Sequence, residues 1–164
     1  MKEVNFDKIS NLSRQDRYSE VLKAVESLTE GEPNLTANLS NIASLLKHSF
    51  DYYLWVGFYL YDTEKNNLVL GPFQGKLACT RIEIGKGVCG TSFKNNQSII
   101  VDDVEKFPGH IFCDTSSRSE IVVPIVKNGK AAGVIDVDSS EYASFDDTDK
   151  KYLEILSAMI SNLF

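Results

Sequence analysis

Three cysteines are the nucleophilic side chains that stand out in this 164-residue chain. They are Cys79, Cys89 and Cys113, and no two of them form a C-x-x-C pair. A cysteine thiolate can attack an electrophilic oxygen or sulfur centre and become a sulfenic acid, which a second cysteine then converts to a disulfide. The sequence therefore leaves three hypotheses open for these residues: inert buried thiols, a metal site, and redox chemistry.

The metal hypothesis is disfavoured by the spacing of the ligands. His110 lies three residues before Cys113 and would bring the number of soft ligands to four. The separations between the three cysteines, however, match no standard zinc finger. We expect no metal in this protein, and we interpret the other histidine, His48, as structural.

The segments around the cysteines favour redox chemistry. Cys113 ends the run Phe-Pro-Gly-His-Ile-Phe-Cys, and Cys79 also lies in an expected loop; such loops are often functional. The run Gly85–Gly90 matches G-x-G-x-x-G, but the neighbouring strands look antiparallel and the next acids come too early for a dinucleotide site. A tight turn there would place Cys89 in the first turn of a helix, where the dipole lowers a thiol pKa. Packing of a small buried Cys89 under the helix remains the alternative.

Three acidic residues form a second candidate cluster. Asp136 and Asp138 project from the same side of an expected strand, although aspartate is uncommon in strands. Glu120 opens the partner strand, and pairing about the turn Asn128-Gly129 predicts Asp136 opposite Ile121. Three neighbouring carboxylates suit an ammonium group, and their repulsion keeps one of them protonated as an acid. A strand end facing solvent is the simpler alternative.

An aromatic face could form the wall of a pocket beside these acids. Trp55, Gly57, Tyr59 and Tyr61 alternate with apolar residues along one expected strand, so they share one side of it. Large rings with polar tips and a gap at the glycine suit a small-molecule pocket. Burial of both sides under helices explains the same pattern equally well.

Helices at both ends of the chain must position these strands and loops. Ser13 and Asn34 are expected N-caps of two helices, and a third helix is expected to open at Asp146; all three have apolar residues at helical spacing. Strands are expected at 53–61, 67–73, 80–84, 98–101, 120–127 and 130–139, with a short helix at 87–94. This order predicts an α+β domain with a central, mainly antiparallel sheet of about five or six strands, flanked by N- and C-terminal helices.

Composition excludes several classes of partner. The chain has 17 Lys and Arg against 23 Asp and Glu, a formal charge of −6 that disfavours nucleic acid. The most apolar stretch, 52–61, is shorter than the ~20 residues that span a bilayer. The first residues lack the pattern of a signal peptide. We therefore expect a cytoplasmic protein with no nucleic acid and no membrane partner, in which an odd number of cysteines argues against a structural disulfide framework.

Six segments together resemble the free methionine-(R)-sulfoxide reductases, which are enzymes on the GAF fold. The segments are LWVGFY at 54–59, LGPFQG at 70–75, GKGVCG at 85–90, FPGHIFCD at 107–114, SEIVVP at 119–124 and GVIDVDS at 133–139. The resemblance implies a single GAF domain over residues 1–164. Within it, 1–50 would form N-terminal helices, 51–140 the sheet and active-site loops, and 146–164 the C-terminal helix.

The resemblance also implies an activity. The chain would reduce free L-methionine (R)-sulfoxide to L-methionine, with Cys113 forming the sulfenic acid and either Cys79 or Cys89 resolving it to an intramolecular disulfide. Thioredoxin would recycle the disulfide, no bound cofactor or metal would be needed, and the protein would be a homodimer. The alternatives are a non-catalytic GAF module that binds a small molecule or senses redox state, and a peroxide-reducing thiol protein.

The substrate-binding residues follow from the same resemblance. Trp55 and Tyr59 would line the pocket for the methyl and thioether end of the substrate. Because a sulfoxide oxygen leaves only when protonated, the site needs a carboxylic acid of raised pKa. Backbone amides or a cation must meet the substrate carboxylate, and Lys86 and Arg118 are candidate cations. The residues that would bind the ammonium or help to protonate the leaving oxygen are Glu120, Asp136 and Asp138.

Overall fold

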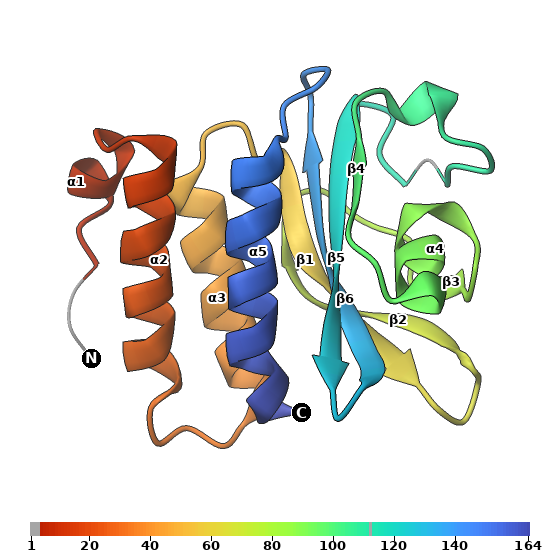
Figure 1. The fold of residues 1–164 in the computed structure, drawn as a ribbon, viewed down its shortest axis with the longest axis horizontal. Coiled ribbons are helices and arrows are strands. Elements are labelled where there is room, and N and C mark those ends of the chain that lie inside the picture. Colours follow the sequence, from red (N-terminus) through yellow and green to blue (C-terminus); the bar gives the residue numbers. More distant parts are fainter. Residues whose placement is uncertain (1–3, 112) are drawn as a thin grey trace.

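Two long helices pack against one side of the β-sheet, and a third long helix lies on the outer side of these two (Figure 1). The computed structural model describes residues 4–111 and 113–164. The expected N-caps Ser13 and Asn34 are confirmed, and Asp146, the expected first residue of the last helix, is its N-cap; each accepts a hydrogen bond from a first-turn backbone N–H. These residues satisfy amides that a helix leaves without an internal partner. The helices are α2 (Arg14–Thr29), α3 (Leu35–Ser49) and α5 (Asp147–Ile160).

Three short helical segments were not predicted. Helix α1 (Phe6–Ser10) is capped by the Asn5 side chain, and the 3₁₀ turns η1 (Val104–Lys106) and η2 (Ser161–Leu163) follow β4 and α5. Segments of three to five residues are too short for apolar periodicity to reveal them, because that signal needs a window of about 11 residues.

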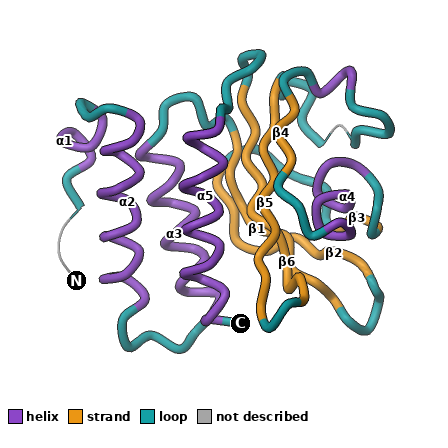
Figure 2. The backbone as a smooth tube through the Cα atoms, viewed as in Figure 1, coloured by secondary structure: helices purple, strands orange, loops and turns teal. Residues whose placement is uncertain are grey.

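The sheet has six strands, all antiparallel to their neighbours, in the order β3-β2-β1-β6-β5-β4 (Figure 2). This confirms the predicted α+β class and the antiparallel sheet. Most strand ends lie within two residues of the expected ones. The strands are β1 (Trp55–Asp62), β2 (Asn67–Gln74), β3 (Arg81–Glu83), β4 (Ile99–Val101), β5 (Ser119–Lys127) and β6 (Lys130–Ser139).

The two sides of the sheet are covered by different parts of the chain. Val56 and Phe58 of β1 pack on the long helices. Trp55 and Tyr59 belong to a second buried cluster on the other side, which also contains Cys89. There the short helix α4 (Gly87–Asn95) and the long loops cover the strands (Figure 1). Both sides of β1 are therefore buried, and its aromatic side faces the loops that carry the cysteines.

A β-bulge sets the register of the β5–β6 hairpin. The prediction that Asp136 lies opposite Ile121 is wrong, because Asp136 pairs with Val122. The register shifts between Ile125 and Val126, where Ala132 of β6 is the additional residue. Facing residues of an antiparallel pair point to the same side, so this shift brings Glu120 opposite Asp138 and onto the side of Asp136. Regular pairing would have turned Glu120 toward the helices.

Within the described residues, no helix combines the length and the apolar character that crossing a membrane requires.

Candidate active site

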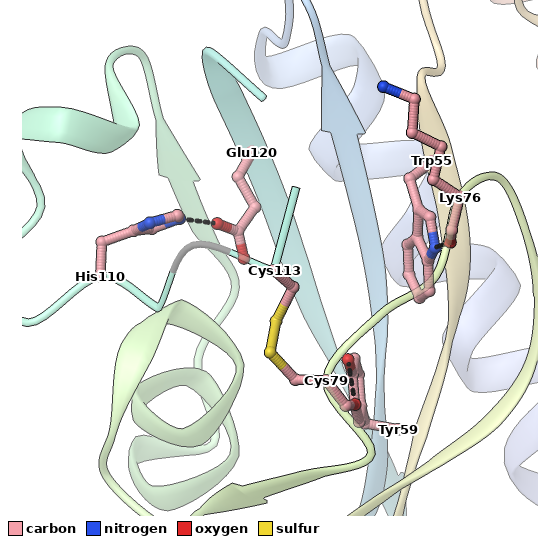
Figure 3. Close-up of a disulfide and its surroundings, with 7 residues drawn as sticks. All are labelled: Trp55, Tyr59, Lys76, Cys79, His110, Cys113 and Glu120. Carbon is pink, nitrogen blue, oxygen red and sulfur yellow. Dashed lines mark hydrogen bonds and ion pairs between the residues drawn. A yellow bond between two sulfur atoms is a disulfide. The ribbon is translucent and has the colours of Figure 1, made fainter. Parts of the chain in front are cut away.

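A disulfide joins the two loops that carry Cys79 and Cys113 (Figure 3). Cys79 lies between β2 and β3, and Cys113 lies in the long loop before β5. Their Cα atoms are 5.5 Å apart, within the usual range for a disulfide. Cys113 is exposed and Cys79 is partly exposed, whereas Cys89 is a free, buried cysteine. The bond therefore lies where a solution reductant can reach it.

Two aromatic side chains hold the Cys79 loop against the sheet. The Trp55 indole donates a hydrogen bond to the Lys76 carbonyl at 3.1 Å, and the Tyr59 hydroxyl donates to the Cys79 carbonyl at 2.9 Å (Figure 3). The Lys76 ammonium lies 3.5 Å from the Asp114 carboxylate, beside Cys113. These contacts place the two cysteine loops over the aromatic side of β1.

Three carboxyl groups converge beneath these loops. Glu120 and Asp136 are buried, with 5% and 7% of their surface exposed, and Asp138 is partly exposed. Burial raises the pKa of all three carboxyls well above the ordinary value, and the negative charges of their neighbours raise it further. The cluster can therefore hold protons near neutral pH and donate them to a bound substrate.

These groups line a common pocket. Of the eight site residues predicted from the sequence, seven line it, and Cys79 is the exception. Its free space is about 40 Å³. The first turn of α4 contributes Gly87 and Val88 to the wall. The seven predicted residues in the wall are Trp55, Tyr59, Cys89, Cys113, Glu120, Asp136 and Asp138.

Comparisons with known proteins decide the family. A model described as GAF domain matches residues 34–164. The chain is 47% identical over 158 residues to free methionine-R-sulfoxide reductase from Saccharomyces cerevisiae, covering 93% of this chain and 88% of that protein. The solved structure of free methionine-R-sulfoxide reductase from Neisseria meningitidis in complex with its substrate is 45% identical, with a TM-score of 0.94, and covers 100% of this chain and 96% of that chain. This chain belongs to the free methionine-R-sulfoxide reductase family.

A second curated relative of the same name agrees with this assignment. Free methionine-R-sulfoxide reductase from Escherichia coli is 41% identical over 152 residues, covering 93% of this chain and 91% of that protein. The predicted GAF fold and the predicted family are thus both confirmed.

The expectation for the thiol of Cys89 is corrected by the structure. Cys89 lies in the first turn of α4, as predicted, but its pKa is raised well above the ordinary value rather than lowered. Burial is the main cause, and the charges of Asp136 and Glu120 add to it. Desolvation and nearby negative charge outweigh the helix dipole, so Cys89 is held as a neutral thiol at neutral pH.

His110 is a site residue that the sequence analysis treated only as a possible zinc ligand. Its Nε2 atom lies 2.9 Å from the Glu120 carboxylate, and both side chains are at least nine-tenths buried (Figure 3). Burial lowers the pKa of His110, which favours the neutral imidazole. Its place three residues before Cys113, in the Pro-Gly loop, was the available signal.

The two cations considered for the substrate carboxylate are not among the residues that line this pocket. The Arg118 guanidinium donates to the carbonyls of Thr115 and Ser117, and Lys86 is an exposed residue at the N-cap of α4. The Lys86 side chain makes no cap hydrogen bond, and the first turn of α4 lines the pocket. Backbone amides of this turn are therefore better placed for an anion than either cation.

Proposed function

We propose that this chain reduces free L-methionine (R)-sulfoxide to L-methionine, using Cys113 as the nucleophile. The observation that carries the proposal is the Cys79–Cys113 disulfide at the edge of a pocket with three carboxyl groups and two aromatic rings. The names of the yeast, bacterial and structural relatives support the substrate.

The reaction balances with the groups in this pocket. The Cys113 thiolate takes the sulfoxide oxygen while a protonated carboxyl, Glu120 or a neighbouring aspartic acid, gives that oxygen its proton. Cys113 is oxidised to a sulfenic acid, and the substrate sulfur is reduced to the thioether of methionine. The Cys79 thiol then attacks the sulfenic sulfur, releasing water and forming the disulfide. Cys79 is the resolving residue in this scheme because it pairs with Cys113 in the structure.

Recognition of a free amino acid follows from the charges of the pocket. A peptide-bound methionine sulfoxide lacks the free ammonium that the three acids of the pocket can hold. The substrate carboxylate would meet the first-turn amides of α4, at Gly87 and Val88. Trp55 and Tyr59 provide an apolar wall for the methyl group on the sulfur.

The disulfide form is the product state of this cycle. The free space of the pocket in this form is only about 40 Å³, on the scale of a few water molecules. A free amino acid with ten non-hydrogen atoms needs more room, so we infer that the substrate binds only after the disulfide is reduced. We propose thioredoxin as the reductant, a cytoplasmic location and a homodimer, with no bound cofactor or metal required for turnover.

The activity is tested by thioredoxin-coupled consumption of NADPH with four substrates in parallel. These are free (R)-sulfoxide, free (S)-sulfoxide, a peptide containing methionine sulfoxide, and hydrogen peroxide. We expect turnover with the free (R)-sulfoxide to exceed the others by at least about 100-fold, an energy difference near 2.7 kcal/mol. Equal rates with peroxide would instead support a peroxide-reducing thiol protein, and no turnover with any substrate would support a non-catalytic GAF module.

A further inference from the structure

Cys89 has no covalent role in the proposed cycle, yet it lies at the centre of the acidic cluster. Its sulfur and one carboxylate oxygen each from Glu120 and Asp136 all lie within 4.8 Å of one another. All three residues are buried. Thiolate and carboxylate groups are the donor types that bind zinc and related divalent cations.

A second observation points to a ligand at this place. The Oδ1 atom of Asp136 is buried and makes no hydrogen bond among the residues that the structure describes. Asp136 as a whole is 7% exposed and forms part of the pocket wall. The side chains of Cys89 and Glu120 contact the Asp136 carboxyl but leave this oxygen without a hydrogen bond. Buried carboxylate oxygens are nearly always paired, so an unpaired one in the wall of a pocket favours a positively charged occupant.

We propose that Cys89, Glu120 and Asp136 bind one thiophilic divalent cation, such as Zn²⁺, in the disulfide form of the protein. The Cys89 proton is released to solvent when the metal–sulfur bond forms, and the protons that the Glu120 and Asp136 carboxyls hold are released when their oxygens bind the metal. Zinc bonds of about 2.3 Å to sulfur and ~2.1 Å to oxygen put tetrahedral ligands roughly 3.6 Å apart. Donors already within 4.8 Å of one another thus need to move by about 1 Å. Water completes the coordination.

The size and charge of the pocket distinguish this cation from the substrate. Free space of 40 Å³ accepts an ion with a water molecule but not a free amino acid. A divalent cation also removes the repulsion among the acids, which a single ammonium does only in part. Where the proposed reductase function holds, the cation in the disulfide form lies where the substrate ammonium binds once the disulfide is reduced.

The binding test is independent of catalysis. In the disulfide form Cys89 is the one remaining thiol, so Cd²⁺ added to this form has a single cysteine to bind. We expect one Cd²⁺ per chain by equilibrium dialysis, with an ultraviolet charge-transfer band from the cadmium–thiolate bond. Zn²⁺ should displace the Cd²⁺ and remove the band. Because binding is measured without substrate, failure of the reductase assay leaves this result unaffected.

Three variants decide between this site and surface binding. Cys89→Ser should lose the band, and Asp136→Asn should keep the thiol but weaken Cd²⁺ binding at least about 100-fold, the upper end of what loss of an outer-shell partner costs. Asp51→Asn removes an exposed acid that does not line the pocket and should change nothing. The proposal is overturned by the absence of the band in the native protein. It is also overturned if Asp136→Asn binds Cd²⁺ as tightly as the native protein does.

Discussion

Burial of Asp136 beside other acids gives the pocket its chemistry and costs stability. The native pKa of Asp136 is raised, chiefly by burial and then by the charge of Glu120. The unfolded chain therefore releases this proton near pH 4, while the native chain keeps it to a higher pH. Since the native state binds more protons over this range, the free energy of unfolding falls as the pH rises.

Asp136→Asn should therefore stabilise the protein more at pH 8 than at pH 4. We expect the increase in the free energy of unfolding to be larger at pH 8 than at pH 4 by at least about 1.4 kcal/mol, the equivalent of one pKa unit. Urea denaturation at both pH values measures it, with Asp51→Asn, an exposed acid, as the control. Equal gains at pH 4 and pH 8 would show that Asp136 is not held as an acid of raised pKa.

At the level of the strands, Gly57 allows β1 to carry the aromatic wall. A Cβ atom at this position would lie 2.5 Å from the Cβ atom of Phe73 and 2.6 Å from the Trp55 ring. The gap predicted at this glycine is therefore occupied by the indole. Because of this close approach, the Trp55 ring stacks on Phe73 and its indole N–H donates to the Lys76 carbonyl of the Cys79 loop.

Gly57→Ala should displace the Trp55 ring and weaken substrate binding. We expect kcat/KM for free (R)-sulfoxide to fall roughly 10-fold, or about 1.4 kcal/mol, within the range for overpacking. Gly31→Ala is the control. Alanine is strained at this position, where φ is 75°, but its added methyl group meets no neighbouring atom, and the residue does not line the pocket. An unchanged kcat/KM in Gly57→Ala would remove Trp55 from the substrate site.

Local signals predicted the elements but not how the hairpin pairs. The N-caps and the Asn128-Gly129 turn are encoded within a few residues, so they could be read directly from the sequence. The bulge at Ala132 could not, since it depends on how β5 and β6 fit between two buried layers. Its effect reaches the site, because it determines the side on which Glu120 lies.

The same distinction applies to the cysteines. Their types and loops predicted redox chemistry, but the partner of Cys113 depends on two loops that meet only in the folded sheet. The raised pKa of Cys89 likewise follows from burial beside Asp136, which spacing along the chain does not show. The contact of His110 with Glu120 could not be predicted either, because it joins the long loop to β5.

Across the whole molecule, the helical layer and the active site lie on opposite sides of the sheet (Figure 1). Asp149 at the start of α5 ties the helical layer together and is fully buried. It accepts hydrogen bonds from Tyr18 of α2 at 2.8 Å, from Tyr52 at 2.6 Å and from Arg14 at 2.8 Å. Removal of this carboxylate takes an acceptor from all three donors, although Arg14 keeps its contact with Asp146 and Tyr18 keeps its contact with the Tyr53 hydroxyl.

Asp149→Ala should lower the free energy of unfolding by about 2–4 kcal/mol, as expected for removing a buried acceptor of several hydrogen bonds. Activity per folded molecule should stay unchanged, because the residue lies across the sheet from the pocket. Urea denaturation measures the free energy of unfolding. The turnover rate divided by the concentration of folded enzyme measures the activity per folded molecule. Asp147→Ala, an exposed acid in the same helical turn, should stay within about 0.5 kcal/mol of the native protein. A loss of activity in the folded Asp149→Ala protein would contradict this separation.

Single-turnover conversion tests the role of Cys113 most directly. The reduced protein is mixed with excess free (R)-sulfoxide without any reductant, and methionine and cysteine-linked peptides are quantified. We predict one methionine per chain together with a Cys79–Cys113 disulfide. Cys79→Ser should still yield one methionine and leave a trappable sulfenic acid on Cys113, whereas Cys113→Ser should yield none. Methionine formed by Cys113→Ser at the native yield would contradict the account.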